Sequence, residues 1–194
     1  MARTVIELVE IKKINPHIKI EVVYATKNNF TGQVIYTSSK CYLRKEVAQA
    51  LSVVQKDLEK IGLGLKVWDG YRPMSAQQKL WESLAKKYPN EVEREYYVSN
   101  PKKGGRHTRG TAVDCTLIDL KTGKEVEMPT PFDHFGKEAW RDYNGRGLSA
   151  KAKKMREVLQ STMKKHGFEG IRTEWWHFDY KGWQQCASLT IELR

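Results

Sequence analysis

The 194-residue sequence predicts an α+β fold, in which helices pack on a small mixed or antiparallel sheet. Two observations favour this class: helical periodicities alternate with short strand-like runs, and the length suits one domain with a sizeable core. No internal repeat or low-complexity tract divides the chain. We therefore expect residues 1–194 to form a single domain.

Three segments have helical patterns. The clearest covers residues 43–61, where apolar residues recur every three or four positions as Leu43, Val47, Leu51, Val54, Leu58 and Ile61. A second helix is predicted after Pro73, because Ser75 and Gln78 have the spacing of a capping box. A third should begin after Ser149, with an apolar face made of Ala152, Met155, Leu159 and Met163.

Strands are predicted in four runs of β-branched and apolar residues, at 18–24, 65–69, 111–117 and 171–178. The polar segment 89–105 reads as a long surface connection that could border a cleft. Residues 121–147 contain several Pro and Gly residues and predict an extended irregular loop.

The net charge of +11 raises the question of a nucleic-acid partner. The lysines, however, form scattered pairs and no single basic stripe, so a solvated cationic surface is the simpler interpretation. A basic nucleic-acid-binding module remains the alternative from another class, and its affinity would fall steeply with salt. No apolar run is long enough to cross a bilayer, so no membrane insertion is expected.

Three cysteines, Cys41, Cys115 and Cys186, make an odd number without metal-knuckle spacing. Reduced thiols in a cytoplasmic protein are the simplest account. Residues 1–10 carry acidic groups within a short apolar run, which is not typical of a signal peptide. A periplasmic location is the alternative if a leader has been removed, and the oligomeric state is left open.

Asp114 stands inside an apolar strand-like run, where a bare carboxylate would be costly to bury. A cation would remove that cost, and a metal ion or an arginine would serve equally well. His107 lies upstream across Gly110, which permits a close turn, so the imidazole and the carboxylate could face one site.

Glu174 and His177 are three residues apart, on either side of two tryptophans that suit a core or a pocket wall. On a strand they would point to opposite sides, so a bend would be needed to bring them together. With His107 and Asp114, this segment supplies two imidazoles and a carboxylate able to hold a metal, leaving a place for water. Glu174 is then the candidate base, and the pattern indicates a zinc hydrolase.

Arg72 stands between a predicted strand end and a predicted helix start. Pro73 restricts it to extended geometry, which makes a rigid mount for the guanidinium. A structural ion pair with Asp69 is the competing interpretation. His134, beside Asp133 in the long loop, is a candidate for the rim of the cleft, whereas His17 and His166 have no assigned role.

Several motifs in the chain match one known family. They are His107-x-x-Gly110-x-Ala112-x-Asp114, Glu174-x-x-His177, the run Asp69 to Pro73, the run Tyr24 to Gly32 with its Asn-Asn-Phe-Thr-Gly end, and the run Thr130 to Asp133. In this order and spacing, the sequence resembles the zinc D,D-peptidases, and among them the D-alanyl-D-alanine dipeptidases of the VanX and DdpX type.

The resemblance implies an α+β zinc peptidase with one Zn²⁺ per chain, held by His107, Asp114 and His177. It implies Glu174 as the general base and Arg72 as the group that stabilises the developing oxyanion. The expected reaction is hydrolysis of D-alanyl-D-alanine to two D-alanines.

Tyr24 and Asp133 fall where the family lines its dipeptide site, and Asp133 would take the substrate ammonium. The family usually has serine two residues before the first zinc histidine, and Gly105 stands there in this chain. A hydroxyl contact to substrate is therefore absent at that position. A peptidoglycan D,D- or L,D-carboxypeptidase of the same zinc group, acting on longer stems, is the nearer alternative.

Overall fold

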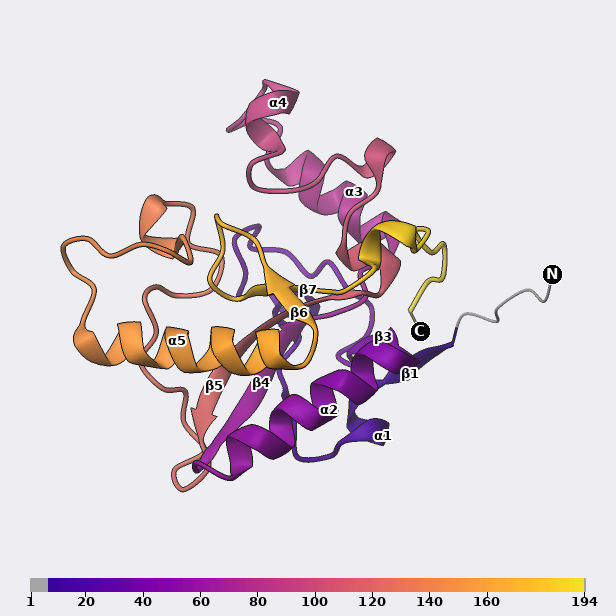
Figure 1. Ribbon diagram of the computed structural model, residues 1–194. Coiled ribbons are helices and arrows are strands. Elements are labelled where there is room, and N and C mark those ends of the chain that lie inside the picture. Colours follow the sequence, from indigo (N-terminus) through magenta and orange to yellow (C-terminus); the bar gives the residue numbers. More distant parts are fainter. Residues whose placement is uncertain (1–6, 194) are drawn as a thin grey trace.

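The computed structural model describes residues 7–193, and it confirms the α+β class (Figure 1). The central sheet has five strands in the order β2-β4-β5-β7-β6, and only the β2–β4 pair is parallel. These strands are β2 (Lys19–Ile20), β4 (Leu63–Asp69), β5 (Ala112–Asp119), β6 (Phe168–Gly170) and β7 (His177–Tyr180). A separate antiparallel pair is formed by β1 (Leu8–Glu10) and β3 (Tyr42–Arg44).

Two long helices, α2 and α5, lie side by side across one face of the sheet (Figure 1). The helices are α1 (Ile11–Ile14), α2 (Lys45–Glu59), α3 (Met74–Ser83), α4 (Glu91–Arg94) and α5 (Ala150–Lys165). Five 3₁₀ turns join them: η1 (Val23–Ala25), η2 (Pro101–Lys103), η3 (His107–Arg109), η4 (Lys137–Ala139) and η5 (Trp183–Gln185). Within residues 7–193, none of these helices combines the length and the apolar character that crossing a bilayer requires.

The apolar stripe predicted for residues 43–61 forms α2, although its two ends differ from the prediction. Leu43 belongs to β3, and Ile61 follows the helix and is exposed. The residues between them that face the sheet are fully buried. The start of α5 is as predicted, because the Ser149 hydroxyl accepts a hydrogen bond from the Ala152 amide at 3.0 Å.

The predicted capping box at α3 is wrong. The helix begins directly after Pro73, so Ser75 already lies inside it. The Ser75 hydroxyl donates to the Glu192 carboxylate at 2.7 Å, and the Gln78 amide donates to Glu82. Contacts along the helix and with the C-terminal segment have replaced the capping contacts that the spacing suggested.

The predicted strands 18–24 and 171–178 are only partly correct. After β2 the chain turns into η1, which directs Tyr24 toward the interior. Residues 171–176 of the second segment form a turn between β6 and β7, which pair antiparallel and therefore need a reversal between them, and only His177 and Phe178 lie in a strand. Its strand-like composition comes from Trp175 and Trp176, which are buried core residues in that turn.

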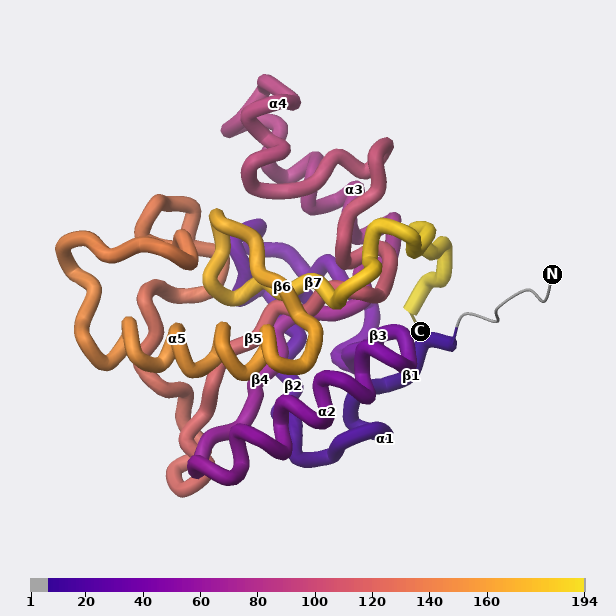
Figure 2. The backbone as a smooth tube through the Cα atoms, in the orientation of Figure 1, coloured from indigo at the N-terminus to yellow at the C-terminus, as the bar shows by residue number. Residues whose placement is uncertain are grey.

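A long loop, residues 120–149, joins β5 to α5 along one side of the sheet (Figure 2). Aromatic contacts fix it to the core. The Phe132 ring stacks on Trp68 with centroids 4.7 Å apart and meets Trp176 at 5.4 Å. The Trp175 indole N–H donates to the Thr130 hydroxyl at 2.9 Å. The predicted irregular loop is therefore a packed wall of the protein.

Candidate active site

Two neighbouring strands bring a carboxylate and an imidazole face to face. Asp114 of β5 and His177 of β7 are directly paired in the antiparallel register. Their side chains therefore project from the same face of the sheet. The Asp114 Oδ1 and His177 Nδ1 atoms are 3.0 Å apart.

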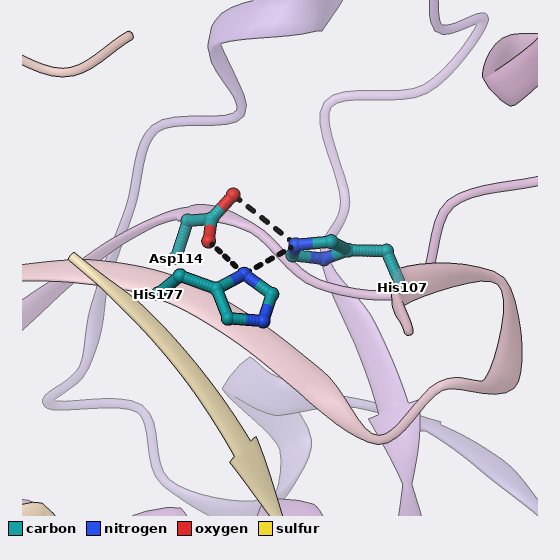
Figure 3. Close-up of side chains that lie close together, drawn as sticks. All are labelled: His107, Asp114 and His177. Carbon is teal, nitrogen blue, oxygen red and sulfur yellow. Dashed lines mark hydrogen bonds and ion pairs between the residues drawn. The ribbon is translucent and has the colours of Figure 1, made fainter. Parts of the chain in front are cut away.

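His107 reaches the same point from η3, as Figure 3 shows. Gly110 ends this turn with a φ of 70°, a left-handed conformation that glycine adopts without strain. The His107 Nε2 atom lies 3.1 Å from His177 Nδ1 and 3.3 Å from Asp114 Oδ2. The turn predicted at Gly110 thus brings His107 to Asp114.

The outer nitrogen of each imidazole is held by the protein. His107 Nδ1 lies 2.9 Å from the Gly70 carbonyl oxygen, and His177 Nε2 lies 3.0 Å from Asp179 Oδ1. An acceptor at the outer nitrogen fixes the proton there and leaves the inner nitrogen free to bind a metal. This is the second layer expected around metal-binding histidines.

The electrostatics of the cluster favour a cation. All three side chains are buried, and their potential ligand atoms lie within 4.8 Å of one another. Although burial opposes it, hydrogen bonds with Asp114 and Asp179 raise the pKa of His177 to about 10. Despite its burial, the two imidazoles hold the pKa of Asp114 well below its usual range. The types of ligand atom, their close approach to one another and the electrostatics of the cluster therefore fit a divalent metal such as zinc.

Glu174 lies in the turn before β7, three residues ahead of His177. This turn supplies the bend that the sequence required, because the Glu174 Oε2 atom is 3.8 Å from His177 Nδ1. Its side chain keeps 24% exposure. Burial, and to a lesser degree the charge of Asp114, raises the pKa of Glu174 above its usual value. A carboxylate with a raised pKa is a stronger base.

Arg72 has the structural partner that the sequence suggested and also faces the pocket. Its Nε and Nη2 atoms donate to Asp69 Oδ2 at 3.1 and 2.6 Å, and Nη1 donates to Gln77 Oε1 at 3.0 Å. A guanidinium has five N–H donors, so two remain for a ligand. The pairing with Asp69 fixes Arg72 in place without using all its donors.

Asp133 and Tyr24 are in contact in the lining of the pocket, although 109 residues separate them in sequence. The Tyr24 hydroxyl donates to the two oxygens of Asp133 at 3.2 and 3.0 Å. Asp133 has a φ of 58°, the only positive value of a non-glycine residue in the described part of the chain. Burial, followed by the charge of Asp114, raises the pKa of Asp133 well above its usual value. A cationic group on a bound substrate would stabilise the ionised form of the Asp133 carboxylate.

These side chains enclose a cavity of about 60 Å³. Every site residue predicted from the sequence lines it, namely Tyr24, Arg72, His107, Asp114, Asp133, Glu174 and His177. A larger space of about 400 Å³ adjoins it and shares Asp133 and Glu174. His134 borders this second space, as expected for a cleft rim, whereas His17 and His166 form ion pairs elsewhere.

Sequence reasoning missed two residues of this site. Gln77 lines the cavity and holds Arg72, and only its position one turn into α3 could have pointed to it. Asp179 contacts His177 from two positions further along the same strand. That spacing places both side chains on one face, so an acidic residue two positions after a candidate ligand was a usable signal.

A buried histidine and carboxylate cluster with a carboxylate base at its edge defines a metal-dependent hydrolase. The comparison with known families makes this more specific. Residues 4–189 match the peptidase M15 family, described as D-Ala-D-Ala dipeptidase, and the chain belongs to that family. The protein is therefore a metallopeptidase.

Similar proteins occur in several bacteria. The chain is 34% identical to a D-alanyl-D-alanine dipeptidase of Escherichia coli (strain K12), over 95% of this chain and 89% of the relative. It is 32% identical to the enzyme of that name from Enterococcus faecalis, over 83% and 85% of the two chains. The relative from Streptomyces coelicolor is also 32% identical, over 84% and 86%. A solved structure of the vancomycin-resistance D,D-pentapeptidase VanY is more distant, with a TM-score of 0.48 and 17% identity over 77% and 78%.

Proposed function

We propose that the protein hydrolyses free D-alanyl-D-alanine to two molecules of D-alanine, with one zinc ion per chain. Membership of the D-Ala-D-Ala dipeptidase family supports this reaction. The observation that carries it is the small cavity, which is lined by both the candidate metal-binding cluster and the half-buried Asp133 carboxylate. Such a space suits a short substrate with a free ammonium group.

His107, Asp114 and His177 would hold the zinc ion. Bound there, zinc supplies a Lewis acid for the scissile carbonyl and makes water acidic enough to ionise near neutral pH. Glu174 takes the proton of the attacking water and passes it to the leaving amine. Its placement beside His177, at the edge of the cluster, supports this role.

Arg72 stabilises the oxyanion that develops on the substrate. Its guanidinium is fixed by Asp69 and Gln77, so the two free donors are already oriented before the substrate arrives. Orientation in advance is what makes such donors effective, because no reorganisation is needed during the reaction.

Asp133 binds the substrate ammonium, and the Tyr24 hydroxyl orients the Asp133 carboxylate. An N-blocked peptide cannot supply this positive charge and would leave the half-buried Asp133 carboxylate without a compensating cation. Selectivity for the free dipeptide follows from that cost. Gly105 lines the same cavity, and an added β-carbon would lie 3.4 Å from Gln77 Oε1 and 3.5 Å from the Ser99 β-carbon. A serine would therefore fit there with little rearrangement.

The test is a turnover assay on three substrates: D-Ala-D-Ala, N-acetyl-D-Ala-D-Ala and a longer stem peptide that ends in D-Ala-D-Ala. We expect release of D-alanine from the free dipeptide alone, loss of this activity with a chelator, and recovery with zinc. Gly105→Ser serves as a matched variant that restores the family's hydroxyl. Equal cleavage of the blocked or longer peptides would replace the dipeptidase assignment with a carboxypeptidase.

A further inference from the structure

The Asp179 carboxylate joins the two segments that carry the histidines of the cluster. It is 4% exposed and lies in β7 on the same face as His177. Its Oδ1 atom is 3.0 Å from His177 Nε2, and its Oδ2 atom is 3.0 Å from the Nε atom of Arg106. Arg106 directly precedes His107 in the chain.

The surroundings of Asp179 leave room for this arrangement. The residue opposite it on β5 is Ala112, whose small side chain occupies little of the shared face. The Arg106 guanidinium covers the ring of Trp183 at 4.8 Å, so its approach to Asp179 is guided by a stacking contact. One carboxylate oxygen therefore lies against the histidine, and the other forms an ion pair with Arg106, whose Nε atom makes no hydrogen bond with the described residues.

The two histidines are held by acceptors of different kinds. His107 Nδ1 lies 2.9 Å from the neutral Gly70 carbonyl, with the Asp69 carboxylate further away at 3.8 Å, whereas His177 Nε2 lies 3.0 Å from a carboxylate. A carboxylate makes a histidine ligand more basic, but a buried carboxylate also needs a counter-charge to stay in place. Arg106 supplies that charge from the segment that carries the other histidine.

We propose that Asp179 is a positioning residue that fixes the ring of His177 for metal binding, and that Arg106 holds Asp179 in this role. The inference rests on the proposed function only in taking His177 as a metal ligand. Because Arg106 and His107 are adjacent, the pair also fixes the distance between the turn η3 and the strand β7.

The test measures zinc affinity directly, by competition with a chelator of known affinity and without any substrate. Asp179→Ala should weaken zinc binding by about 10–100-fold, the usual effect of removing such a partner. Asp179→Asn keeps an acceptor oxygen for His177 and should recover part of the loss. Arg106→Met should weaken zinc binding several-fold through its effect on Asp179.

Arg109→Met is the matched control. Arg109 also covers the Trp183 ring, at 5.7 Å, but it bonds to the Cys186 carbonyl and not to Asp179. It should leave zinc affinity unchanged. In the double variant Asp179→Ala with Arg106→Met, zinc binding should be no weaker than in Asp179→Ala alone, since Arg106 acts only through Asp179.

Three results would overturn the proposal: unchanged zinc affinity in Asp179→Ala, equal affinities of the Asn and Ala variants, or equal effects of Arg106→Met and Arg109→Met. Thermal unfolding of each metal-free variant shows whether it is folded. If Asp179→Ala does not fold, the two arginine variants and Asp179→Asn decide the question. A failure of dipeptidase activity in the parent protein would not affect these measurements.

Discussion

Two parts of the pocket lining, here called its metal wall and its loop wall, are built in different ways. The metal wall, His107, Asp114 and His177, depends on strand pairing, since Asp114 and His177 are direct partners in the register of β5 and β7. The loop wall, Tyr24 and Asp133, comes from a 3₁₀ turn and the loop 120–149. The Tyr24 hydroxyl donates to the Asp133 carboxylate, and this contact joins the two parts of the loop wall.

This difference has a physical consequence. Backbone hydrogen bonds of a sheet fix the spacing of facing side chains, so the metal wall has little freedom. The loop wall keeps its geometry through packing, such as the stacking of Phe132 on Trp68. We therefore expect substitutions in the metal wall to abolish catalytic activity. Substitutions in the loop wall should instead reduce substrate affinity to a limited extent.

The largest effect is expected from Asp114→Ala, which removes one of the three proposed zinc ligands. Zinc affinity should fall by more than about 100-fold, beyond the loss caused by removing an outer partner, and dipeptidase activity should become undetectable. Metal analysis and turnover measure the two effects. Asp119→Ala is the control, because Asp119 lies on the same strand but bonds only to the Thr122 turn among the described residues. Full zinc content in Asp114→Ala would remove Asp114 from the ligand set.

Glu174→Gln should separate chemistry from metal binding. The amide keeps the size of the side chain but cannot take a proton, so kcat should fall by about 10²–10⁴-fold while zinc content is unchanged. Glu157→Gln, an exposed change on α5, is the matched control and should behave like the parent protein. Activity within a few-fold of the parent would mean that another group takes the proton.

Arg72→Lys tests a residue of the pocket lining that belongs to neither wall. Lysine cannot reproduce the fork that holds Asp69 and Gln77 while directing donors into the pocket. We expect kcat to fall by about 10²-fold, with a smaller change in KM. Arg94→Lys, also a buried arginine but one stacked on Trp81 away from the cavity, controls for the general cost of the exchange. An effect confined to KM would make Arg72 a ground-state binder.

The smallest effect is expected from the loop wall. Asp133→Asn keeps a residue that tolerates the positive φ but removes the charge, so KM for the free dipeptide should rise by about 10-fold or more. The ratio of free to N-acetylated dipeptide turnover should narrow at the same time. Asp142→Asn, a change of the same kind in the same loop, affects only an exposed ion pair with Arg172. An unchanged ratio in Asp133→Asn would show that another group recognises the ammonium.

Much of the fold followed from local pattern. The apolar stripe predicted α2, and Ser149 predicted the start of α5, because both signals act within a few residues. The predictions failed where a distant contact decided the structure. Ser75 bonds to Glu192, 117 positions away, and no local rule could anticipate that partner. Residues 171–178 have a strand-like composition, but the pairing of β6 with β7 makes 171–176 a turn, and only His177 and Phe178 belong to a strand.

For the site, the sequence by itself determined the residue types and the local spacing. His107 and Asp114 are separated by a turn and the start of a strand, and Gly110 makes the turn possible. Glu174 and His177 are close because a short turn links them. These relations act over a few bonds, so the sequence contains them.

Only the tertiary structure decided which distant groups meet. The contact of Tyr24 with Asp133 and the approach of Arg106 to Asp179 depend on how loops and strands pack. Such contacts follow from the summed packing of the core, because many weak interactions fix the relative position of segments that the chain alone leaves free. The sequence therefore predicted the residues of the metal wall as a motif. The distant contacts that support this wall, and the contact that forms the loop wall, were found only in the folded protein.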